Sequence, residues 1–125
     1  MENREIPPEI KGWWRIVDTS QWGNRLDVGG TALISLTGYA DRLQLIVLLA
    51  YVNCRGTKTG VSFTWDGAWE FDPVSGTGNA RLSKDGRLKG TLKIKDGDSS
   101  TFIAVRASAP AVPIPHPPSW RDKWK

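Results

Sequence analysis

The fold class is decided by residues 77–102, TGNARLSKDGRLKGTLKIKDGDSSTF, in which apolar and polar side chains alternate along the chain. One side of the alternation holds Leu88, Gly90, Leu92 and Ile94, and the other holds Lys89, Thr91, Lys93 and Lys95. A period of two is typical of a β-strand with one face buried and one face in water. Asp85-Gly86 and Asp96-Gly97 separate the alternating runs, and Asp-Gly is a strong signal for a tight hairpin turn. Neighbouring strands are therefore expected to be antiparallel.

The same alternation continues through most of the chain, for example where Val61, Phe63 and Trp65 alternate with polar residues. Strands are expected near residues 12–18, 31–37, 42–53, 59–66, 77–83, 87–95 and 100–106, and an eighth fits residues 68–72. Residues 19–30 lack a clean period and are expected to form a loop or short helical turn across one barrel mouth. An open sheet of this kind would leave its edges exposed. The sequence therefore predicts an all-β fold, an antiparallel up-and-down meander of seven or eight strands closing into a small barrel.

Composition divides the chain of 125 residues into three regions: a polar N-terminal arm (1–10), a β-barrel domain (11–107) and a Pro/Trp-rich C-terminal tail (108–125). A chain of 13.8 kDa fits one domain with one core. Proline cannot continue a helix or a central strand, so the tail is expected to be extended. Its prolines are Pro110, Pro113, Pro115, Pro117 and Pro118. Near its end, Trp120 and Trp124 are spaced to share one face of a short helical turn.

Two residues at opposite ends of the barrel domain predict how the barrel closes. Trp14 in GWWRI and Arg106 in FIAVR both fall on the inward side of their strands. An inward guanidinium needs a partner, and the face of an aromatic ring supplies one through a cation–π contact. The first and last strands are therefore expected to lie side by side, with Arg106 stacked on Trp14.

Gly12-Trp13-Trp14 near the start of the first strand, together with an Arg on the last, resembles the signature of the calycin superfamily of lipocalins and fatty-acid-binding proteins. Residues 12–106 also resemble a group of small bacterial proteins without an established activity. This second resemblance rests on GWWRI, Trp22, Leu26-Asp27, NCR (53–55), FTWDG (63–67), DPVSGTG (72–78), DGRLKG (85–90) and GDSSTF (97–102). Both resemblances imply a calycin-like barrel, and neither implies an activity.

Charge and composition narrow the function only a little. The net charge of +4 and the pI near 9.5 would suit an acidic partner, but the basic residues are scattered along the chain. The N-terminus lacks the order of a secretory signal, and the one cysteine cannot form an intramolecular disulfide, so a cytoplasmic location is expected. The longest apolar run has eight residues, too few for a membrane-spanning helix, so no membrane insertion is expected.

No catalytic, cofactor-binding or metal-binding residues are predicted. His116 lies between two prolines without a partner nearby, and Cys54 has no adjacent histidine that would activate its thiol. Asp96 and Asp98 flank a glycine in what is better interpreted as a hairpin turn than as half of a calcium loop. Glu70 and Asp72 are expected beside a turn at a barrel mouth. The sequence leaves open whether they are rim residues or part of a site.

The run LIVLLAYV (45–52) gives the main functional hypothesis. In a strand over residues 42–53, one set of apolar side chains would fill the core and the other would form an exposed stripe that a partner must cover. The chain is therefore expected to be a non-enzymatic interaction protein, an accessory subunit or inhibitor, that binds a protein partner or a second copy of itself. The expected interface consists of Ile46, Leu48, Ala50, Val52, Pro113, Pro115, Trp120 and Trp124, and coverage of the stripe by the chain's own tail is the second choice.

Two other functions stay open. A calycin-like barrel can carry a small apolar ligand, in which case the lumen or rim would be formed by Tyr51, Phe63, Trp65, Glu70, Asp72 and Phe102. A lumen filled by these side chains is slightly favoured over a pocket. Nucleic acid is a weaker alternative, because Lys89, Lys93 and Lys95 share an outward face that has no aromatic side chain for stacking on bases.

Overall fold

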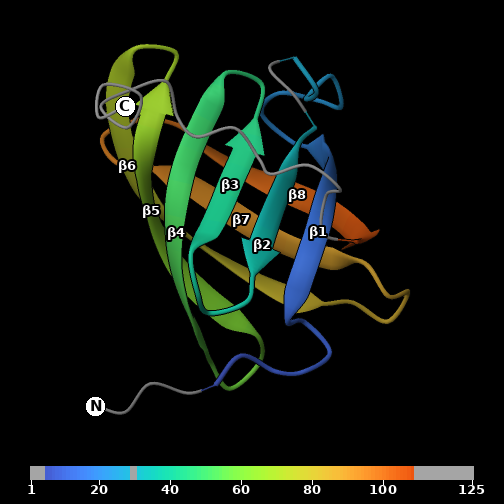
Figure 1. The fold of residues 1–125 in the computed structure, drawn as a ribbon. Helices are drawn as coiled ribbons and strands as arrows, with labels where there is room; N and C mark the ends of the chain where they lie inside the picture. The colour runs from blue at the N-terminus through green and yellow to red at the C-terminus, as the bar shows by residue number, and fades with distance from the viewer. Residues whose placement is uncertain (1–4, 29–30, 109–125) are drawn as a thin grey trace.

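The computed structural model describes residues 5–28 and 31–108, which form a closed barrel of antiparallel strands in sequence order (Figure 1). The strands are β1 (Gly12–Thr19), β2 (Leu33–Leu36), β3 (Asp41–Leu45), β4 (Leu48–Gly56), β5 (Val61–Trp69), β6 (Asp72–Leu82), β7 (Leu88–Ile94) and β8 (Ser99–Ala107). Each strand pairs with its neighbours in the chain, and β8 pairs with β1. The predicted all-β, up-and-down barrel is confirmed. Among the described residues, there is no helix with the length and apolarity that a membrane crossing would require.

The run at residues 45–52 is not part of one strand but contains a hairpin. β3 ends at Leu45 and β4 starts at Leu48, and these two residues pair across a two-residue turn formed by Ile46 and Val47. The turn reverses the direction of the chain and changes which side chains face inward. Asn-Gly or Asp-Gly normally marks such a turn. Because an apolar pair occupies this one, its sequence reads as a continuous strand.

The predicted interface on this run is therefore wrong for three of its four residues. Leu48, Ala50 and Val52 are 3%, 1% and 9% exposed and belong to the core. By alternation, Leu49 and Tyr51 face outward, so Tyr51 does not line the lumen, which was one of the two places predicted for it. Ile46 alone keeps a half-exposed position, at the tip of the hairpin.

A second two-residue turn replaces the expected short eighth strand. β5 runs on to Trp69 and pairs with Asp72 across Glu70 and Phe71, so the strand expected near 68–72 is this hairpin tip. Residues 73–76 pair with β5 inside β6. Residues 20–28 form no strand or helix and lead across the barrel end, as expected.

The lumen is filled by side chains, and glycines make room for the largest of them. Trp65 is directly opposite Gly76 and Phe63 is directly opposite Gly78 on the next strand. A Cβ atom at Gly76 would lie 2.5 Å from the Trp65 ring, and one at Gly78 would lie 2.4 Å from the Phe63 ring. Trp65, Phe63 and Phe102 are each at most 3% exposed. These predicted lumen residues therefore form packed core rather than the wall of an open pocket.

Barrel closure follows the sequence prediction. Trp14 of β1 pairs directly with Arg106 of β8, and the guanidinium carbon lies 4.1 Å from the centre of the Trp14 ring. Arg106 also donates hydrogen bonds to the backbone carbonyls of Glu9 and Lys11. The indole N–H of Trp14 donates to the carbonyl of Ile10 at 2.8 Å. Ile10 is 2% exposed, so the segment that precedes β1 closes this end of the core.

A charge at Leu48 tests the hairpin assignment. We expect Leu48→Lys to lower the free energy of unfolding by about 4 kcal/mol or more, because it would place an unpaired ammonium group in the apolar core. Asn53→Lys is the matched control, since Asn53 is an exposed, outward residue of the same strand. Urea denaturation measures both variants. Equal stability of the two variants would show that Leu48 does not face the core.

Candidate functional site

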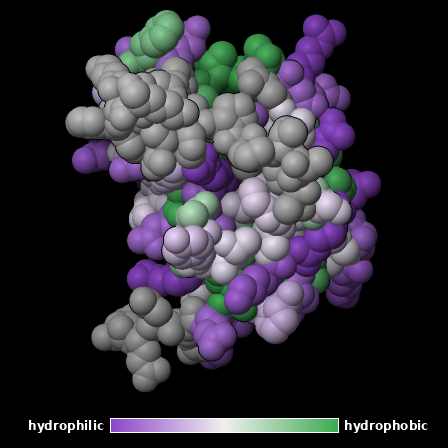
Figure 2. Space-filling model, in the orientation of Figure 1, coloured by the Kyte–Doolittle hydropathy of each residue, from purple (hydrophilic) through white to green (hydrophobic). Residues whose placement is uncertain are grey.

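Apolar side chains gather at the barrel end that holds the β1–β2, β3–β4 and β5–β6 connections. We call this group the apolar rim; its members are Trp22, Val28, Ile46, Val47, Trp69 and Phe71. Phe71 is 89% exposed and Val28 is 66% exposed, while the other four are half-buried. Figure 2 shows hydrophobic residues along the upper edge of the molecule, over the β3–β4 and β5–β6 turns of Figure 1. Side chains of this kind at turn tips are unusual, because turns normally carry polar residues or glycine.

Backbone hydrogen bonds join the three segments that carry the rim. The amide of Ile46 donates to the carbonyl of Leu26 at 2.7 Å, and the amide of Glu70 donates to the carbonyl of Val47 at 3.0 Å. The β3–β4 turn is therefore fixed to residues 20–28 on one side and to the β5–β6 turn on the other. These bonds make the rim one continuous surface rather than three independent tips.

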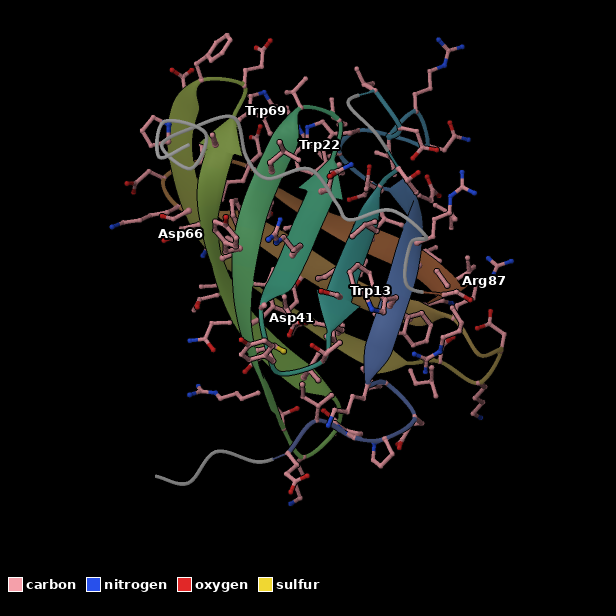
Figure 3. The ribbon with its side chains drawn as sticks, in the orientation of Figure 1. Trp13, Trp22, Asp41, Asp66, Trp69 and Arg87 are labelled. Atoms are coloured by element: carbon pink, nitrogen blue, oxygen red, sulfur yellow. The ribbon has the colours of Figure 1, made fainter. Side chains whose placement is uncertain are left out.

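Two tryptophans complete the rim from different segments. Thr19 and Gly23 close a tight turn through reciprocal backbone hydrogen bonds of 2.9 and 3.1 Å, and this turn holds Trp22. The rings of Trp22 and Trp69 lie 5.7 Å apart between centres, in a tilted arrangement (Figure 3). Tilted aromatic pairs at this distance add attraction beyond the burial of their area. Trp22 thus positions residues 20–28 against the end of β5.

Both turn tips hold the backbone in an unfavourable conformation. Ile46 has a φ of 54° and Glu70 has a φ of 56°, in the left-handed region that favours glycine and asparagine. A β-branched residue such as Ile46 is especially disfavoured there, and a strained position of this kind costs on the order of 1–3 kcal/mol. The chain keeps an apolar side chain at this tip where a turn residue would be more stable. That choice points to a use for the side chain outside folding.

Carboxylates flank the most exposed rim residue. Glu70 and Asp72 stand on either side of Phe71 in the chain, and all three are exposed. Among residues 5–28 and 31–108, no group of three or more His, Cys, Asp or Glu residues is arranged to hold a metal ion. Both residues lie at the rim, where the sequence interpretation left open whether they belong to a site. They give the apolar rim a local negative charge on a chain whose net charge is +4.

Asp41 and Cys54 form a polar cluster at the opposite end of the barrel. The Asp41 carboxylate accepts hydrogen bonds from the Ser35 hydroxyl, from the Thr37 hydroxyl and amide, and from the Gly38 amide. The Cys54 thiol also donates to it, at 3.2 Å. Burial and the Asp41 carboxylate together raise the pKa of Cys54 to about 12. The thiol therefore stays protonated, and the cluster fastens the β2–β3 connection instead of activating a nucleophile.

The outer surface of β4–β7 carries a shallow groove of about 960 Å³ with mixed charge. Lys93 and Lys95 line it on one side, but Asp66 and Asp96 line it as well. Tyr51 reaches the groove and also lies under the guanidinium of Arg42, 4.9 Å from its ring centre. A surface for nucleic acid would be more uniformly basic. The groove therefore gives the nucleic-acid alternative little support.

Four of the predicted interface residues, Pro113, Pro115, Trp120 and Trp124, lie outside the described residues, as does His116. Sequence reasoning missed most of the rim: Trp22, Val28, Val47, Trp69 and Phe71. One signal was available, because the strand expected over residues 42–53 is longer than strands usually are. The excess length of this expected strand was a sign that it contained a turn.

Comparison of the chain with protein-family models, curated proteins and solved structures returned no match. The resemblance to a calycin-like group of bacterial proteins therefore stays a prediction.

The raised pKa of Cys54 predicts an unreactive thiol. In the native protein, we expect iodoacetamide to modify Cys54 far more slowly than in denaturant at the same pH, because the thiolate is nearly absent. Because the folded pKa lies above the unfolded value of 9.0, the thiol contributes stability below pH 9.0 that is lost as pH rises toward about 12. Mass spectrometry of the alkylated protein measures the rates. Equal rates in native and denatured protein would contradict the assignment.

Strain at the β5–β6 turn predicts a stabilising substitution. We expect Glu70→Asn to raise the free energy of unfolding by about 0.5–1 kcal/mol, since asparagine tolerates a positive φ better than glutamate does. Glu70→Ala is the control, because it removes the same charge but does not relieve the strain. Thermal unfolding followed by circular dichroism compares the three proteins. A gain in Glu70→Ala equal to that in Glu70→Asn would assign the effect to charge.

Proposed function

We propose that this protein is a non-enzymatic interaction module that binds a protein partner through its apolar rim. The observation that carries the proposal is Phe71, an aromatic side chain that is 89% exposed at the tip of a strained two-residue turn. Aromatic anchors of this kind supply a large share of the binding energy at protein interfaces. The half-buried Ile46, Val47 and Trp69 beside it supply a fixed apolar base.

The chemistry of the rim indicates what the partner presents. Phe71 would insert into an apolar hollow, and basic groups beside that hollow would face Glu70 and Asp72. Charge complementarity of this kind orients the two proteins and raises the association rate. The same carboxylates oppose binding to anionic lipid surfaces, which attract basic segments. A protein is therefore favoured over a membrane as the occupant of the rim.

The filled lumen favours an interaction surface over a ligand carrier. Trp14, Phe63, Trp65 and Phe102 occupy the barrel interior, and each is at most 3% exposed. Small barrels either fill the interior with side chains or enclose one small ligand. A carrier would have to displace packed aromatic rings, whereas binding at the rim requires no change in the core.

Two exposed aromatic residues at opposite barrel ends give a matched test. Phe71→Ser removes the proposed anchor, and Tyr39→Ser removes an equally exposed ring, 85% accessible, from the β2–β3 connection. Tagged full-length chains would be isolated from the cells that naturally make the protein, and any retained protein would be repurified for calorimetric titration. We expect Phe71→Ser to weaken its affinity about tenfold or more, the loss typical of a truncated anchor, and Tyr39→Ser to leave the affinity unchanged.

Other outcomes of these experiments would assign binding to a different site, to a second copy of the chain or to a lipid surface. Retention of the same protein with equal affinity by both variants would overturn the rim as the binding site. Self-association of the wild-type chain that only Phe71→Ser abolishes, measured by light scattering, would identify a second copy as the occupant. Binding of the wild-type chain, but not of Phe71→Ser, to phosphatidylcholine vesicles would replace the protein partner with a lipid surface.

A further inference from the structure

The two halves of the barrel differ in how far their outward side chains reach water. On β5–β8 no outward residue is buried: Thr64, Thr77 and Thr91 are exposed, and others such as Ser62 and Ile103 are half-buried. On β2 and β3, the outward residues Leu33, Ser35 and Gln44 are only 8%, 1% and 3% exposed. Their direction is fixed by alternation with Ile34 and Leu43, which are fully buried in the core. A closed barrel has a single layer of sheet, so nothing in the barrel itself lies over its outer face. Outward side chains that are this well shielded from solvent therefore require another segment packed over them.

The covered surface has the composition of a docking face. We call it the outer face of β1–β4; it consists of Trp13, Leu33, Ser35, Gln44, Leu49 and Tyr51. Figure 3 shows Trp13 at β1, beside β2, on the side of the barrel that faces the viewer. Gln44 donates to the carbonyl of Thr31, while its side-chain oxygen is buried without a hydrogen-bond partner in the described part of the chain. A buried amide oxygen calls for a donor, so the cover should be polar as well as apolar.

The path of the chain brings a candidate cover to the edge of this face. β8 ends at Ala107, which pairs with Trp13 on β1, and the chain continues beyond it for residues 109–125, outside the described residues. Reaching β4 from the end of β8 crosses four strand spacings, which is about 19 Å at ~4.8 Å per spacing. Seventeen residues in an extended polyproline conformation reach about 50 Å, so the remaining chain is more than twice as long as this distance.

We propose that residues 109–125 dock across the outer face of β1–β4 of the same chain. The prolines restrict the segment before it binds, which lowers the loss of conformational entropy on docking. Trp120 and Trp124 provide large apolar areas that can pack against Leu33 and Leu49. Amide and indole N–H groups of the segment provide donors for the Gln44 oxygen. This occupant differs from the partner proposed for the apolar rim, which lies at the end of the barrel.

Paramagnetic relaxation in the full-length protein tests the proposal. A nitroxide label is attached to Ser119→Cys in a Cys54→Ser background, in which the serine hydroxyl can still donate to Asp41. We expect backbone amide signals of β2–β4 to lose several-fold more intensity than those of β6–β7. Adding Trp120→Ser and Trp124→Ser to the labelled chain should reduce this difference, because the apolar contacts would be lost. A label on Lys84→Cys, in the β6–β7 connection, gives the reference pattern for a site away from the face.

Mixing labelled chains without ¹⁵N and unlabelled chains with ¹⁵N separates docking within one chain from docking between chains. We expect no selective loss at β2–β4 in this mixture. A selective loss there would assign the outer face to a second copy and overturn docking within the chain. Equal loss on all strands in the single-chain experiment, or no loss at all, would overturn the proposal altogether.

Discussion

Pairing of β8 with β1 is the contact on which the whole barrel depends. Every other strand pair joins neighbours in sequence, so those pairs would form equally well in an open meander. Closure alone removes the two exposed edges, and it must overcome the entropy of joining strands from opposite ends of the domain. Arg106 over Trp14 adds a specific contact to that seam. The carbonyls of Glu9 and Lys11, which accept from the same guanidinium, tie the preceding segment to the seam as well.

Closure into a small barrel also determines where binding can occur. Eight strands leave space for side chains, and the chain fills that space by placing rings opposite glycines, as with Trp65 and Gly76. An alanine at Gly76 would clash with both the Trp65 ring and the backbone carbonyl of Lys93, so the strand as well as the ring would have to move. An interior packed this way leaves the outer faces and the two ends as the surfaces on which a partner can act. One end is closed by Ile10 and the Arg106 seam, and the other holds the apolar rim.

The sequence was informative wherever polar and apolar residues alternate. Leu88–Ile94 and the Asp-Gly turns beside it predicted the antiparallel meander, and Trp14 with Arg106 predicted its closure, because each signal depends on one local rule. Ile46-Val47 and Glu70-Phe71 escaped prediction because neither turn contains the residues that its conformation favours. Missing the first turn reversed the assigned direction of Leu48, Ala50 and Val52, since a hairpin restarts the alternation.

The unfavourable residue at the Ile46 turn explains why the sequence did not predict that turn, and it also motivates the functional proposal. A chain selected only for stability would place asparagine or glycine at a positive φ, and a chain selected only for solubility would not expose Phe71 at a turn tip. Both features occur in neighbouring turns that one hydrogen bond, from Glu70 to Val47, holds together. Residues that are locally unfavourable for folding and that lie close together on a rigid support are typical of binding surfaces. The rim is therefore the part of this barrel whose sequence is explained least by folding, which is the basis for proposing that it contacts another protein.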